Sequence, residues 1–230
     1  MRKSLVTLSV LAALPFVGAA PVMAEDSPHS VSANIGFVSD YVYRGYSQTN
    51  ENIAIQGGFD YSHASGLYAG VWGSSIDWLD KGGTEVDVYG GYKAAMGDFG
   101  CDVGVLQYAY PGGKIGGKSP DTTEVYLGAS WKFVSFKFSH AFTDLFGIPD
   151  SDGSQYYELG ASYDIGAGFT TAAHFGRQKV EGGTSYNDWK VGISKEYAGF
   201  GFGLAYIDTD LDHSDDNADE RIVFSVSKSF

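Results

Sequence analysis

The sequence has few of the features that would place it among soluble disulfide-bonded, nucleic-acid-binding or helical membrane proteins. Its single cysteine, Cys101, excludes an internal disulfide. Its 15 basic residues stand against 28 acidic ones, and a formal charge of −13 leaves no basic stripe for nucleic acid. Prolines number only 6, and beyond residue 24 there is no run of about 20 apolar residues, the length that a spanning helix needs.

Residues 1–24 have the pattern of a secretory signal peptide. Arg2 and Lys3 supply the charged start, residues 5–20 are mostly apolar, and Val22-Met23-Ala24 offers a small-residue cleavage site. Because Pro15 and Pro21 interrupt a short apolar stretch, a retained transmembrane helix is disfavoured. We expect export, cleavage, and one mature domain over residues 25–230.

What the chain has in quantity is glycine, tyrosine and phenylalanine, arranged with a period of two. In residues 39–78, Ile53, Ile55 and Phe59 fall on one face, while Gln56 and Asp60 fall on the other. Strict alternation of apolar and polar residues predicts a β-strand with one apolar face and one polar face.

Twelve segments alternate in this way, and the connections between them follow a rule. Connections after odd-numbered segments are mostly long and polar or glycine-rich, and those after even-numbered segments are tight turns. Transmembrane barrels have this asymmetry between external loops and periplasmic turns, with strands of about 9–11 residues. The sequence therefore predicts an all-β fold, a transmembrane antiparallel up-and-down β-barrel of about 12 strands, over residues 32–44, 52–62, 67–78, 84–95, 99–110, 122–132, 134–143, 155–165, 168–178, 186–196, 200–207 and 221–230.

A soluble β-sandwich also alternates, and aromatic residues at the ends of the segments decide against it. Such residues fit the two girdles at the membrane interfaces of a barrel. They are Tyr46, Trp78, Tyr92, Trp131, Trp189 and Tyr197.

The motifs SDYVYRG, AIQGGFDYSH and SGLYAGVWGSS in the first third resemble the TorF family of porins, and the similarity runs from about Ser32 to Phe230. The resemblance implies an outer-membrane barrel of a Gram-negative bacterium, without catalytic residues or an established substrate to transfer. The last strand, which ends at Phe230, resembles the signal that outer-membrane barrels present to the barrel assembly machinery. Outer-membrane lipids and lipopolysaccharide are the surroundings that the resemblance implies.

The inward face predicts a narrow aqueous channel, because twelve strands lie between filled barrels of eight and open porins of sixteen. Small inward residues such as Gly91 and Gly104 favour an open lumen. In the first hairpin, a turn near residue 50 would place Asp40 beside Asp60 and Arg44 beside Gln56, as a polar constriction or as a bracing ion-pair network. Inward carboxylates outnumber inward bases, which predicts weak cation selectivity. The pore-lining candidates are Asp40, Arg44, Gln56, Asp60, Asp87, Lys93, Asp102, Glu124, Glu158 and Lys190.

The last long loop, residues 208–220, has seven carboxylates and no lysine or arginine. Asp208, Asp210 and Asp212 are weak candidates for Ca²⁺ or Mg²⁺ ligands, since the spacing of a calcium-binding loop is missing. A solvated extracellular loop is the favoured explanation of the charge, and divalent ions that bridge the loop to lipopolysaccharide phosphates are the alternative.

Catalytic motifs are missing from the sequence. It contains no G-x-S-x-G elbow, phosphate-binding loop or H-E-x-x-H, and the adjacent Ser139 and His140 would point to opposite faces of a strand. The sequence therefore favours a channel for small hydrophilic solutes that needs no cofactor. A structural or adhesive barrel without conductance is the alternative, and a lipid-modifying enzyme is a weaker one.

Overall fold

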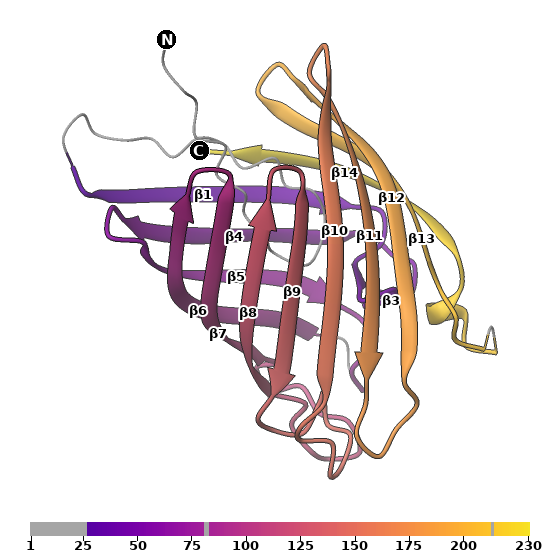
Figure 1. Ribbon diagram of the computed structural model, residues 1–230. Coiled ribbons are helices and arrows are strands. Elements are labelled where there is room, and N and C mark those ends of the chain that lie inside the picture. Colours follow the sequence, from indigo (N-terminus) through magenta and orange to yellow (C-terminus); the bar gives the residue numbers. More distant parts are fainter. Residues whose placement is uncertain (1–26, 81–82, 213) are drawn as a thin grey trace.

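The computed structural model describes residues 27–80, 83–212 and 214–230, so the predicted signal peptide lies outside the described residues. Twelve antiparallel strands close into one barrel, in which each strand pairs with its neighbours in sequence and the first strand pairs with the last (Figure 1). The predicted fold is confirmed. The strands are β1 (His29–Val38), β4 (Ala54–His63), β5 (Leu67–Ile76), β6 (Gly83–Met96), β7 (Phe99–Ala109), β8 (Thr122–Trp131), β9 (Val134–Ala141), β10 (Gln155–Gly166), β11 (Phe169–Lys179), β12 (Tyr186–Tyr197), β13 (Phe200–Thr209) and β14 (Arg221–Ser229).

Three further elements lie outside the barrel wall. The two-residue strands β2 (Val42–Tyr43) and β3 (Tyr46–Ser47) pair only with each other, between β1 and β4. A short 3-10 helix, η1 (Asp216–Ala218), lies in the last loop. The predicted first strand, 32–44, is therefore wrong at its end, because β1 stops at Val38 and the chain then forms a separate hairpin.

The two ends of the barrel differ as predicted. At one end the strands are joined by tight turns, and the residue pairs Ala167–Gly168 and Ala198–Gly199 both have positive φ, as a type I′ hairpin turn requires. At the other end the connections are long, and Figure 1 shows those after β9 and β11 beside each other at the bottom of the view. The chain ends at the tight-turn end, where Phe230 exchanges two backbone hydrogen bonds with Ala33.

The outer surface of the barrel is apolar. Large side chains that alternate along the strands are exposed, among them Phe59 at 64%, Val191 at 54% and Ile222 at 69%. A belt of exposed apolar residues of this extent is found on proteins that meet lipid or another protein. Among the described residues, no helix is long and apolar enough to cross a membrane.

The inner surface is polar, and tyrosine rings fill part of it. A Cβ atom built on Gly104 would lie 2.3 Å from the Tyr126 hydroxyl, and one built on Gly91 would lie 2.6 Å from the Tyr68 hydroxyl. These glycines make room for rings from the directly opposite positions of the neighbouring strands, Tyr68 opposite Gly91 and Tyr126 opposite Gly104. The interpretation that inward glycines keep the lumen open is therefore wrong at both positions.

Candidate functional site

The candidate site is the lumen at the long-loop end, where the hairpin β2–β3 folds into the barrel. The turn of this hairpin is Arg44–Gly45, and both residues have positive φ, 47° and 82°. Glycine is the residue that adopts this conformation without strain. A Cβ atom on Gly45 would also lie 2.4 Å from Cγ2 of Thr209 on β13, so the turn packs tightly against this strand.

The side chain of Arg44 crosses the lumen and is held by two strands of the wall. Its Nη2 donates to both carboxylate oxygens of Glu124 on β8, at 3.0 and 2.8 Å, and its Nη1 donates to Oε1 of Gln178 on β11 at 2.7 Å. The guanidinium lies 4.2 Å from the ring centroid of Tyr156 and 4.8 Å from that of Tyr43. Only 4% of the Arg44 side chain and 3% of the Glu124 side chain are exposed, so this ion pair is buried.

The base of the hairpin is fixed by a second buried ion pair. Asp40 accepts hydrogen bonds from Ser47 Oγ at 2.6 Å and Thr49 Oγ1 at 2.9 Å, and from Nη1 of Arg221 on β14 at 2.8 Å. Since Arg221 is at the start of the last strand, Asp40 connects the first loop to the last loop. The neighbouring Tyr46 donates to Asp215 in that loop.

The predicted grouping of Asp40 with Asp60 and Arg44 with Gln56 is wrong. In the register between β1 and β4, Asp60 is opposite Ser32 and Gln56 is opposite Gly36. The pairing ends at Val38 and Ala54, before the chain reaches Asp40 and Arg44. Asp60 instead accepts a hydrogen bond from the Tyr89 hydroxyl, and Gln56 donates to Ser74 Oγ at 3.3 Å. The four side chains have four different sets of partners.

Tyrosines from the loops after β1 and β7 enclose an inward carboxylate that is not among the predicted pore-lining candidates. Glu85 on β6, 2% exposed, accepts from the Tyr41 hydroxyl at 2.8 Å and the Tyr110 hydroxyl at 3.1 Å. Burial, and then the charge of Glu85, raise the pKa of both tyrosines well above the usual value, so their hydroxyls remain donors. Burial and the bond to Asp215 likewise raise the pKa of Tyr46 to about 12.

An aromatic cluster closes the space beside this carboxylate. The hydroxyls of Tyr43 and Tyr108 share a hydrogen bond of 2.7 Å. The ring of Phe146, from the loop after β9, meets both tyrosine rings edge-on at centroid distances of 5.6 and 5.2 Å. The inserted hairpin is therefore packed as well as hydrogen-bonded.

The middle of the lumen holds a polar chain on neighbouring strands. His174 on β11 lies 2.8 Å from Asp188 on β12 and 3.5 Å from Glu158 on β10, and the Tyr156 hydroxyl donates to Asp188 at 2.9 Å. Lys190 is opposite His174 in the register of β11 and β12. Of the predicted pore-lining residues, Glu158 contacts His174 in this chain, and Lys190 lies opposite His174 in the register.

The tight-turn end of the lumen has its own cluster. Asp102 accepts from the Tyr68 hydroxyl at 2.6 Å and lies 3.9 Å from Lys93 Nζ, which stands 4.4 Å from the Tyr68 ring centroid. Tyr68 and Tyr126 share a further hydrogen bond. The predicted pore-lining residues thus fall into separate levels along the barrel, and each level has partners from several strands.

Two buried carboxylate oxygens have no hydrogen-bond partner among the described residues. They are Oδ1 of Asp87 and Oε2 of Glu158. The residue Asp87 is only 5% exposed. A buried polar atom without a partner is costly unless water or a solute satisfies it. Both oxygens are acceptors, and so they suit a cation or a hydrogen-bond donor.

Several residues that build this part of the lumen lie outside the predicted set of pore-lining residues. Glu85, Tyr156, Asp188 and Arg221 are at positions that the alternation predicts to face inward, but long-range partners cannot be read from parity alone. The residues that sequence reasoning missed are Tyr41, Tyr108, Tyr110, His174 and Gln178.

The carboxylates proposed as metal ligands have hydrogen-bond roles. Asp208 accepts from the Thr209 backbone at 2.8 Å and the Tyr206 hydroxyl at 3.0 Å, and Asp210 accepts from the Asn187 backbone at 2.6 Å. In the part of the chain that the structure describes, no group of three or more His, Cys, Asp or Glu side chains has an arrangement that could hold a metal ion. Asp212, in the loop after β13, is exposed.

Ser139 and His140 point to opposite faces of β9, as predicted. Ser139 is 2% exposed inside the barrel, whereas the His140 ring contacts the outward rings of Phe138 and Phe142. The pair cannot share a proton.

Two solved structures have the same fold over nearly their whole length. The KdgM porin superposes with a TM-score of 0.61 at 10% identity, over 86% of this chain and 99% of that one. The COG4313 outer membrane channel from Pseudomonas putida F1 superposes with a TM-score of 0.52 at 12% identity, over 93% and 100%. At these identities the likeness shows the fold, that of outer-membrane porins.

The sequence itself has no match among curated proteins. The TorF resemblance is not confirmed by the comparisons and stays a prediction. A sequence model of a bacterial protein family of unknown function, Gcw_chp, matches residues 23–230. The chain therefore belongs to the Gcw_chp family.

Proposed function

We propose that this protein is an outer-membrane channel for passive diffusion of small hydrophilic solutes, with a weak preference for cations. The observation that carries the proposal is a closed twelve-strand barrel with an apolar outer belt and a polar interior. The likeness to the KdgM porin and to the COG4313 outer membrane channel supports the same role. That both are described as channels also supports a function without catalysis.

The proposed route of the solute passes the inserted hairpin. Arg44 and its partner Glu124 narrow the lumen at the long-loop end, which is the external end in this proposal. The lumen also holds the unpartnered oxygens Oδ1 of Asp87 and Oε2 of Glu158. A carboxylate oxygen that lacks a protein partner is available to a cation, and this supports the cation preference.

The proposed surroundings follow from the same topology. The signal peptide would direct the chain to the periplasm, and the last strand, with Phe230 at its end, would be presented to the barrel assembly machinery. The tight turns would then face the periplasm and the acidic loop 208–220 would face outward.

The fullness of the lumen favours a second candidate, a structural or adhesive barrel that does not conduct. Arg44 is bonded to two strands and stacked on two rings, so the hairpin occupies space that a solute would need. Conductance distinguishes the two candidates directly.

The test is single-channel recording of the refolded mature protein in a planar bilayer under a KCl gradient. We expect small discrete steps and a reversal potential that favours K⁺. The double variant D87N/E158Q should shift the reversal potential toward zero, whereas the control D150N, in the exposed loop after β9, should not. Absence of steps beside a conducting general porin would support the structural barrel, and a reversal potential that favours Cl⁻ would refute the cation preference.

A further inference from the structure

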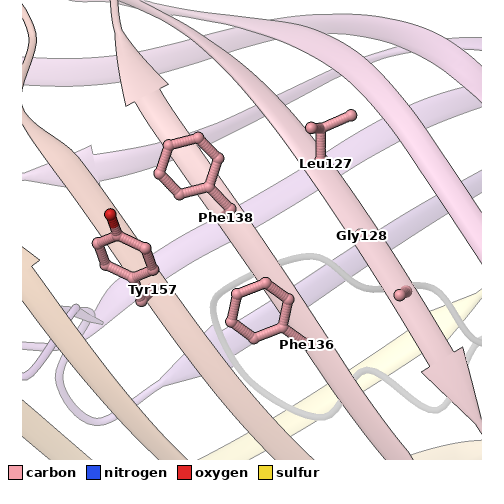
Figure 2. A pocket seen from close by; sticks show the side chains of 6 residues that line it. Leu127, Gly128, Phe136, Phe138 and Tyr157 are labelled. Carbon is pink, nitrogen blue, oxygen red and sulfur yellow. The ribbon is translucent and has the colours of Figure 1, made fainter.

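The outward face of the barrel carries a groove across β8, β9 and β10. Its volume is about 450 Å³, and Figure 2 shows the side chains that line it, with the rings of Phe138 and Tyr157 side by side. The groove exists because small residues on β8 stand beside rings on β9. Ala129 is opposite Phe136 in the register of the two strands. The lining residues are Leu127, Gly128, Ala129, Phe136, Phe138 and Tyr157.

The groove leads toward two basic side chains at the long-loop end. Tyr157 is opposite Arg177 on β11, and Nζ of Lys179 lies 5.5 Å from the centroid of the Tyr157 ring. Gln178 between them points inward and is 2% exposed, so Arg177 and Lys179 share the outward face. Since β11 ends at Lys179, both bases lie where the lipid-facing surface meets the polar surface.

These bases stand out against the charge of the rest of the chain. The protein has a formal charge of −13, and the loop 208–220 near β13 and β14 holds seven carboxylates. Arg177 Nη1 donates to Asn187 Oδ1 at 3.3 Å. Because this acceptor is neutral, the contact does not balance the charge of the guanidinium. Asn187 is in turn positioned by Asp210. An anionic group is the complement of this pair.

The groove by itself provides little affinity in a membrane, because lipid tails are as apolar as the side chains that would replace them. Selective binding must therefore come from the charged end. Arginine binds phosphate oxygens with two parallel hydrogen bonds, and lysine adds a point charge. A ligand that has a phosphate at the membrane surface and an acyl chain below it matches both parts of the surface.

We propose that Arg177 and Lys179 bind a phosphate of a lipopolysaccharide-type glycolipid, with one of its acyl chains in the groove of Tyr157, Phe138 and Leu127. The site lies on the outside of the barrel, apart from the lumen. It depends on the outer-membrane setting of the proposed function but does not depend on conduction. Binding and conductance are measured separately, so either can fail alone.

The test is a titration of the detergent-refolded protein with purified diphosphorylated lipid A, read by native mass spectrometry. The variant R177Q/K179Q should bind at least tenfold more weakly, about 1.4 kcal/mol. The matched control K195Q/K228Q removes two outward lysines that lie over Phe169 and Phe200 at the tight-turn end, and it should bind like the wild type. A heat-modifiable shift on gels verifies that each variant is folded.

Two further arms separate the phosphate from the chain and from other occupants. Dephosphorylated lipid A should bind the wild-type protein weakly, with the same affinity that diphosphorylated lipid A has for R177Q/K179Q. The variant A129F should lower the binding of diphosphorylated lipid A, because the new ring would fill the groove. Equal binding of both lipids, or unchanged binding by R177Q/K179Q, would overturn the proposal. A dimer by light scattering that A129F abolishes would overturn it too, since the occupant would then be a second copy.

Discussion

The buried ion pair between Arg44 and Glu124 allows a quantitative prediction. Replacing Arg44 by alanine removes a guanidinium that bonds to both oxygens of Glu124, and leaves that carboxylate almost fully buried. Breaking a buried pair by removing one partner costs about 3–5 kcal/mol, because the remaining charge is uncompensated. We therefore expect R44A to lower the free energy of unfolding by about 3–5 kcal/mol.

The double variant R44A/E124Q tests whether the pair is the cause. With both charges removed, part of the cost should be recovered, and the coupling energy of the cycle should be about 1–3 kcal/mol. The hydrogen bond to Gln178 and the stacking on Tyr156 are lost in both variants that lack Arg44, so they cancel in the cycle.

The assay is urea unfolding of the barrel in micelles, with tryptophan fluorescence as the signal. A single-channel record of the same proteins adds a second readout, since a hairpin released from β8 and β11 should raise the conductance of R44A. A coupling energy below about 0.5 kcal/mol would refute the reasoning, because residues without shared partners add within that limit. Unchanged conductance in R44A would refute the role of the hairpin as the constriction.

Three further changes test the packing of the turn, the lipid-facing belt and the rings inside the barrel. G45A should destabilise the protein by about 1–3 kcal/mol, since Gly45 has φ of 82° and the wall is close, as urea unfolding would reveal. V191R should cost about 2–4 kcal/mol for folding into bilayers if Val191 faces lipid; a change within about 0.5 kcal/mol would mean a water-facing surface. G70A should displace the Tyr89 ring, which lies 2.4 Å from the new Cβ, and lower the free energy of unfolding by about 1–3 kcal/mol. G128A, whose new Cβ would lie 3.4 Å from the Cβ of Asp102, should be nearly neutral, and equal effects of the two variants would contradict this reasoning.

The wall of the barrel could be predicted from the sequence because its physical signal is local. Lipid outside and polar groups inside impose a period of two on each strand, and turns such as Ala198–Gly199 show where the strands end. The inserted hairpin could not be predicted in the same way. Residues 39–47 continue the alternation, since β2 and β3 are themselves extended, and so the first strand was predicted to reach Arg44.

The contents of the lumen were predictable only as a set of inward positions. Arg44 and Glu124 were both recognised as inward, but they are 80 residues apart and on strands that are not neighbours. Parity along a strand says which face a side chain takes, and it says nothing about how far the side chain reaches across the lumen. The glycines opposite Tyr68 and Tyr126 illustrate the same limit, because the room they make is filled from another strand.

The contacts of the inserted hairpin also set an order of events during folding. Arg44 bonds to residues 80 and 134 positions away, and Asp40 bonds to Arg221, 181 positions away. Contacts so distant in sequence form only after the loops between them have closed. The hairpin reaches its full set of contacts only once β8, β11 and β14 stand in the wall, so we expect the lumen to be filled late in folding.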